Sequence, residues 1–155
     1  MNQPVKAVVS HRFAFSAERV YDAWLDPEWI GRWMYGPAVR EERIVRLGLE
    51  PRVGGKFSFV VERQGVEVNH VGEYLELDRP ALLVFTWGTA DSRPATSRVV
   101  VEILPCVGGC ELTLTHVMTA DWAGYADKAA GAWLKMLGAL DGALVETNSL
   151  TLHSS

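Results

Sequence analysis

The sequence predicts an α+β fold in which a curved antiparallel sheet of about seven strands wraps around one long C-terminal helix. Three observations lead to it. Apolar and polar residues alternate as in strands through the middle of the chain, turn residues separate these runs, and one apolar stripe follows the last helix. Strands joined by hairpins form an antiparallel sheet. A helix with a single apolar face covers one side of such a sheet, and curvature lets the sheet enclose it.

An N-terminal strand and two short helices come first. Residues 5–15 alternate with a period of two, which is typical of a strand. Ser16 is a favourable N-cap for a helix over 17–25. Asp26-Pro27 supplies the N-cap and first residue of a second short helix, and Gly36-Pro37 ends it.

The middle of the chain is rich in strands. Six are predicted, over 40–47, 56–63, 66–77, 81–88, 96–104 and 110–118. The connections between them carry turn residues or polar residues, at Gln64-Gly65, 78–80, 89–94 and Gly108-Gly109. Each connection after residue 63 is short enough to join neighbouring antiparallel strands.

A long amphipathic helix closes the chain over about 122–145. Its apolar residues recur at spacings of three and four, so one face packs on something large. Four glycines, Gly124, Gly131, Gly138 and Gly142, lie within it. They indicate either a close approach of helix and sheet or a flexibility that lets the helix shift over a ligand.

Length and composition predict a single domain over 4–146 with a frayed tail at 147–155. The 19 acidic residues against 15 Lys and Arg give a net charge of −4, which argues against a nucleic-acid partner or an anionic membrane. We see neither a membrane span nor a secretory signal, so the expected location is cytoplasmic. Cys106 and Cys110 lack the spacing of a redox or zinc motif, and we expect two free thiols, although they could pair if oxidised.

The chain resembles the START/Bet v 1-like (SRPBCC) superfamily, which has the helix-grip fold. Within it, the chain resembles the family named after the activator of Hsp90 ATPase, the homologue 1-like domains. The resemblance covers nearly the whole chain. Its segments are SAERVYDAWLDPEWIGRWMYGP (16–37), RVGGKFSF (52–59), GEYLELDRPALLVFTW (72–87) and GGCELTLTH (108–116), followed by the Trp-rich C-terminal helix. The resemblance implies a pocket for a hydrophobic, often aromatic, ligand, but it implies no reaction.

Three histidines lie on predicted strands, and His153 lies in the tail. His116 shares a side with Leu112 and Leu114, so it faces the helix if they do. His70 shares a side with Tyr74, but a bulge at Gly72 would reverse the side on which the later residues lie. The sequence therefore leaves undecided which face of 66–77 points inward.

An inward histidine paired with a Tyr or Glu could act as an acid or base, which makes His116, His70 and Tyr74 the catalytic candidates. The alternative is a single polar group that anchors a ligand. His11, His70 and His116 come from separate strands without a local ligand pattern, so we expect no metal and no cofactor.

The aromatic residues either fill a core or line a cavity. In the second interpretation Trp29, Trp33 and Met34 form a lip where the second short helix meets the open end of the grip. Replacing Trp33 would then weaken ligand binding without unfolding the protein. The candidate ligand-binding residues are Trp29, Trp33, Met34, Phe57, Phe59, His70, Tyr74, Phe85, Trp87, His116, Met118, Trp133 and Leu137.

Three functions remain open at this point. The first is a binding protein that holds a hydrophobic, aromatic or lipid-like small molecule between sheet and helix. The second is an enzyme of the polyketide cyclase, aromatase or hydrolase kind that uses an inward histidine. The third is an Hsp90-type co-chaperone or stress-response interaction module. Homodimerisation through exposed apolar strand residues is also open.

Overall fold

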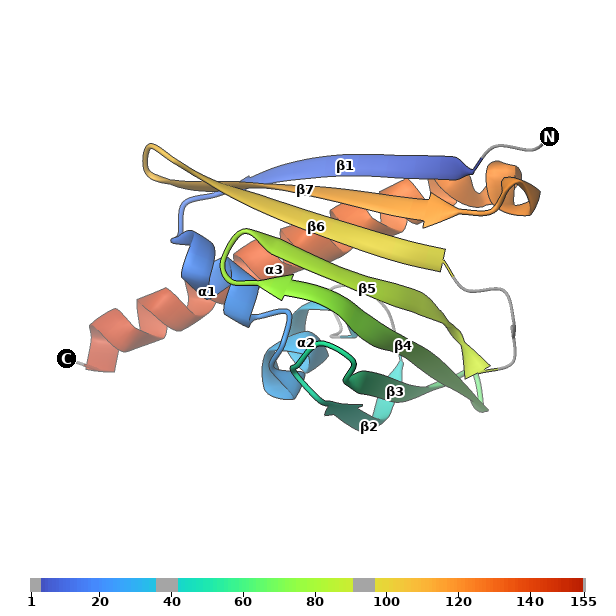
Figure 1. Ribbon diagram of the computed structural model, residues 1–155. Helices are drawn as coiled ribbons and strands as arrows, with labels where there is room; N and C mark the ends of the chain where they lie inside the picture. Colours follow the sequence, from blue (N-terminus) through green and yellow to red (C-terminus); the bar gives the residue numbers. More distant parts are fainter. Residues whose placement is uncertain (1–3, 36–41, 91–96, 155) are drawn as a thin grey trace.

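The computed structural model describes residues 4–35, 42–90 and 97–154, and Figure 1 shows one antiparallel sheet gripping a long helix. The sheet has seven strands in the order β1-β7-β6-β5-β4-β3-β2. This confirms the predicted fold class. The elements along the chain are β1 (Val5–Phe13), α1 (Ala17–Asp22), α2 (Pro27–Trp33), β2 (Arg43–Leu49), β3 (Lys56–Arg63), β4 (Val66–Asp78), β5 (Leu82–Thr89), β6 (Ser97–Cys106), β7 (Gly109–Met118), η2 (Ala120–Tyr125) and α3 (Ala126–Ser154).

Local side-chain chemistry begins the two short helices as predicted. The Ser16 hydroxyl accepts a hydrogen bond from the backbone N–H of Arg19, at 3.2 Å, and so caps α1. Asp26 caps α2 by accepting from the N–H of Glu28 at 3.0 Å, and Pro27 is the first helical residue. The expected stop at Gly36-Pro37 lies outside the described residues.

The hairpin between β3 and β4 turns at Gln64 and Gly65. Both have positive φ, 53° and 81°, which matches the right-handed twist of the flanking strands. The strand boundaries on either side agree with the sequence prediction. This hairpin fixes the register of β3 against β4, so that Phe59 pairs with His70 and Phe57 with Gly72.

The register of β4 decides the question that the sequence left open. The bulge lies between Tyr74 and Glu76 rather than at Gly72, so His70 and Tyr74 stay on one side, and both are buried. A Cβ at Gly72 would collide with the backbone carbonyl oxygen of Thr86 and with the ring of Phe57, so glycine is needed for this close approach of β5 and Phe57 to β4.

The C-terminal helix differs from the prediction at both ends, and it runs to Ser154 instead of ending near Val145. Residues Ala120–Tyr125 form the 3-10 helix η2, and the α-helix α3 begins at Ala126. Gly124, a weak helix former, lies at this transition. A Cβ built on Gly131, Gly138 or Gly142 meets nothing within 4 Å, so close approach to the sheet is not the reason for these glycines.

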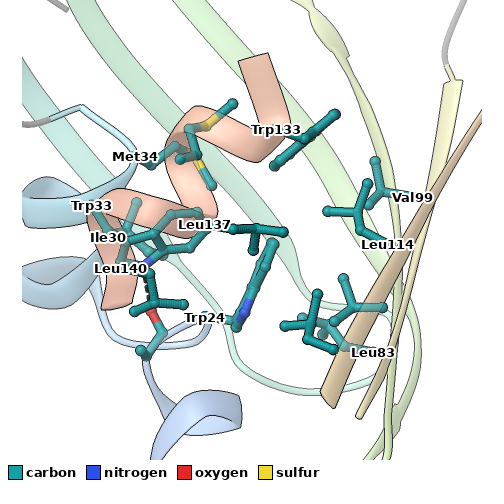
Figure 2. Close-up of a cluster of buried hydrophobic side chains, with 14 of the residues drawn as sticks. Trp24, Ile30, Trp33, Met34, Leu83, Val99, Leu114, Trp133, Leu137 and Leu140 are labelled. Atoms are coloured by element: carbon teal, nitrogen blue, oxygen red, sulfur yellow. Dashed lines mark hydrogen bonds between the residues drawn. The ribbon is translucent and has the colours of Figure 1, made fainter. Parts of the chain in front are cut away.

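The core fills one end of the space between sheet and helix. Trp24 and Trp33 pack with Leu137 and Leu140 of α3, as Figure 2 shows. The Trp33 indole N–H donates to the carbonyl of Ala23 at 3.0 Å, and the side chain is fully buried. The pocket described below lies toward the other end of the grip.

Candidate ligand pocket

A pocket of about 630 Å³ opens between α3, η2 and the inner face of the sheet. Its size lies within the range of about 300–1,000 Å³ typical of small-molecule sites. Its walls come from the ends of β3 to β7 and from the first turns of α3. The lining residues are Glu42, Arg63, Val68, His70, Trp87, Gly88, Thr89, Ser97, His116, Met118, Thr119, Trp122, Tyr125, Ala129, Ala132, Trp133, Lys135 and Met136.

Aromatic rings form two walls of the pocket. Trp87 of β5 and Trp133 of α3 lie with ring centroids 5.6 Å apart at its inner end. Trp122 and Tyr125 of η2 meet edge to face at 5.7 Å. Each of these two is 43% exposed, so they lie where the pocket opens to solvent. Large apolar rings exposed in a concave site are typical of binding surfaces for aromatic or apolar ligands.

A continuous chain of hydrogen bonds ties the inner walls together. The Trp133 indole N–H donates to Nδ1 of His116 at 3.1 Å. His116 therefore carries its proton on Nε2, which donates to the Ser97 hydroxyl at 2.6 Å. Ser97 donates in turn to the backbone carbonyl of Trp87 at 2.8 Å. Each of these four groups has a fixed role, and the chain links α3 to β5, β6 and β7.

His116 is held neutral in this arrangement. Burial lowers the pKa of its imidazole from 6.5 to about 4, because desolvation penalises the charged form. Its Nδ1 lone pair is already occupied by Trp133. A general base needs a free lone pair and a pKa near the working pH, so the geometry favours His116 as a structural link.

His70 occupies the neighbouring part of the wall. Its ring stacks on Trp87, with centroids 5.0 Å apart and an interplanar angle of 12°. Its Nδ1 hydrogen-bonds the hydroxyl of Tyr35 at 2.9 Å. The phenol partner of this histidine is thus Tyr35, which follows α2, and not Tyr74. His70 and Tyr74 are four residues apart on one strand, which separates their Cα atoms by about 13 Å.

Three charged residues border the pocket. Arg63 donates to Oε1 of Glu42 through Nε at 2.9 Å and through Nη2 at 2.8 Å. Lys135 comes from α3, and its side chain is exposed. No Asp or Glu among the described residues forms an ion pair with Lys135.

The structure divides the sequence-predicted residues into two groups. Five line the pocket, namely His70, Trp87, His116, Met118 and Trp133. Seven others are buried in the core and do not border this pocket, namely Trp33, Met34, Phe57, Phe59, Tyr74, Phe85 and Leu137. Trp29 packs against the core from outside, under the Arg32 guanidinium at 5.2 Å, and also lies away from the pocket. The exposed aromatics at the opening of this pocket come from η2, and Trp29, Trp33 and Met34 of the expected lip do not line it.

Several residues that line the pocket were absent from the predicted site. The main ones are Trp122, Tyr125, Lys135, Ser97 and Arg63. Trp122 was visible in the sequence as part of an apolar helix stripe. It lines the pocket from the 3-10 helix η2, which comes before α3. Tyr125 and Lys135 carried no signal beyond their residue type.

Three further chemically active side chains of the described residues, His11, Cys106 and Cys110, lie outside the pocket lining. His11 of β1 contacts Asp141 of α3 at 2.8 Å. Cys106 and Cys110 are both free thiols, and burial raises the pKa of Cys110 to about 11. The described residues contain no group of three or more His, Cys, Asp or Glu arranged to hold a metal ion. Among the described helices, none is long and apolar enough to span a bilayer.

The fold and the pocket define this protein as a helix-grip domain of the START/Bet v 1-like class. The chain belongs to the family described as Activator of Hsp90 ATPase homolog 1-like protein, which matches residues 14–145. That family supports either a ligand-binding or a co-chaperone type of domain. No curated protein matches the chain.

Solved structures agree with the fold. Protein NE0264 from Nitrosomonas europaea has a TM-score of 0.80 at 18% identity, covering 94% of this chain and 97% of its own. A protein from Rhodobacter sphaeroides has a TM-score of 0.79 at 20% identity, covering 93% and 98%. A protein of unknown function, SA2116 from Staphylococcus aureus, gives 0.77 at 17%, covering 92% and 97%. At these identities the similarity establishes the fold alone.

Proposed function

We propose that this protein binds a hydrophobic small molecule with an aromatic ring in the pocket between η2, α3 and the sheet. The observation that carries the proposal is the pocket of about 630 Å³ with Trp87, Trp122 and Trp133 in its walls. A planar ligand gains both apolar burial and ring stacking against such walls.

The internal hydrogen bonds favour binding over acid–base chemistry at His116. Its two ring nitrogens are both engaged, one by Trp133 and one by Ser97. A reacting group would have to displace one of these partners before a proton could move. Because the same bonds fix the Trp133 indole and the backbone carbonyl of Trp87, their most direct effect is to keep this wall of the pocket rigid, which lowers the entropy cost of binding.

The proposal is tested by filling the pocket. Ala132 lines it from α3, so Ala132→Trp places a large ring in the ligand space. Leu134→Trp is the matched control, since Leu134 is an exposed residue of the same helix outside the lining. The probe is naphthalene-2-methanol, an uncharged bicyclic alcohol, followed by calorimetry or tryptophan fluorescence.

We expect the wild-type protein and Leu134→Trp to bind this probe with a dissociation constant on the order of micromolar. Ala132→Trp should bind at least about tenfold more weakly while keeping the circular dichroism of the wild type. Equal binding by both variants, or no binding by the wild type up to the solubility of the probe, would refute the proposal. If the wild type binds the probe as expected, native mass spectrometry of protein purified from its host, followed by extraction of any bound molecule, would identify the natural compound.

A further inference from the structure

The polarity of the pocket is uneven, and this limits how a ligand can lie in it. At the inner end, the chain from Trp133 through His116 and Ser97 to the carbonyl of Trp87 uses every N–H and O–H proton of those three side chains. A ligand carboxylate there would find no free donor from them, and an unpaired buried charge is very unfavourable. The apolar part of the ligand therefore belongs at this end.

The charged residues lie on the border of the same pocket. Arg63 and Glu42 neutralise one another through two short contacts. Lys135 adds one positive charge that no described carboxylate pairs with, so the lining residues that the structure describes carry a formal charge of +1. This sign is opposite to the net charge of −4 on the chain.

Lys135 is placed to reach a ligand group at the opening. It immediately precedes the lining residue Met136 and lies two and three residues after the lining residues Trp133 and Ala132 of α3. Its flexible stem can extend along the apolar wall while the ammonium stays in water. A cation in this position attracts an anionic group and disfavours a cationic one.

We propose that the pocket selects an aromatic ligand with one carboxylate, whose ring lies against Trp87 and Trp133 and whose carboxylate is bound by Lys135 at the opening. This inference rests on the proposed function, because it specifies the ligand of the same pocket. Arg63 is already engaged by the carboxylate of Glu42, so the proposal assigns the ligand carboxylate to Lys135.

Three probes that share one ring system separate charge from shape. They are 2-naphthoate, naphthalene-2-methanol and (2-naphthylmethyl)trimethylammonium, and each is titrated at pH 7 in low salt. We expect the wild type to bind the naphthoate about tenfold more tightly than the alcohol, and the ammonium most weakly. The preference for the naphthoate should shrink in high salt, because screening weakens the contact at an exposed lysine.

Substitution at Lys135 assigns the effect to that residue. In Lys135→Met the ratio of naphthoate to alcohol affinity should fall from about ten to about one, and Lys135→Arg should retain it. Lys128→Met is the control, since Lys128 is exposed on the same helix but outside the lining, and it should leave the ratio unchanged.

Each outcome decides between the two proposals. Equal affinity for naphthoate and alcohol in the wild type, tighter binding of the ammonium, or a ratio that survives Lys135→Met would overturn the inference and leave the proposed function intact. Failure of all three probes to bind would overturn both.

Discussion

The neutral, doubly hydrogen-bonded state of His116 predicts a specific dependence of stability on pH. In the folded protein burial holds the pKa of His116 at about 4, against 6.5 for the exposed imidazole of an unfolded chain. Between these values the unfolded state binds the extra proton and the folded state does not. Stability is therefore fully present above pH 6.5 and is lost as pH falls toward 4.

The size of the effect follows from the two pKa values. Linkage gives a loss of about 2 kcal/mol between pH 7 and pH 5 and about 3 kcal/mol once the pH is below both values. Protonation would also place a proton on Nδ1 opposite the indole N–H of Trp133, which breaks that hydrogen bond. Both effects lower the free energy of unfolding as the pH falls.

The assay is urea unfolding of the wild type and of His116→Gln at pH 7, 6 and 5. Other histidines and the carboxylates titrate in both proteins, so their contributions cancel in the difference between the two curves. We expect the stability advantage of the wild type to shrink by about 2 kcal/mol between pH 7 and pH 5. A difference that stays constant over this range would refute the reasoning, as would a nuclear magnetic resonance titration that places the folded pKa of His116 near 6.5.

Two further predictions concern packing. Gly72→Ala should destabilise the protein by roughly 1–3 kcal/mol, because the added methyl collides with the backbone carbonyl oxygen of Thr86 and with the ring of Phe57. Gly138→Ala on the open side of α3 should stabilise it by up to about 1 kcal/mol, and the urea midpoint measures both changes. Trp33→Ala should cost about 3–5 kcal/mol of stability, because Trp33 is fully buried; a variant with unchanged thermal unfolding and weakened naphthalene-2-methanol binding would restore Trp33 to the binding site.

The sequence was sufficient for the fold because its local signals agree. Ser16 and Asp26 cap the helices that they were expected to cap, and Gln64-Gly65 turns the hairpin between β3 and β4. The boundary between η2 and α3 was missed, since an apolar stripe with a period of 3.6 continues through both. A 3-10 turn before an α-helix leaves little trace in such a pattern.

The pocket was only partly predictable, for a different reason. Alternation along a strand shows which side chains point inward, and it placed Phe57, Phe85, Trp87 and His116 on the inner face. It does not show whether inward side chains meet one another or enclose a space. That depends on how Leu137 and its neighbours on α3 fill the distance to the sheet, which is a property of the three-dimensional packing.

Sheet order has a consequence for how the chain folds. Every strand from β2 to β6 pairs with the next one along the chain, but β1 pairs with β7, with Phe13 opposite Cys110 and Val5 opposite Met118. Joining segments about 100 residues apart costs roughly 3 kcal/mol more in loop-closure entropy than closing a tight hairpin. During synthesis the first strand must therefore wait, unpaired in the sheet, until the last strand has left the ribosome. The same late event delivers His116 and then α3, so the final closure of the sheet also creates the pocket.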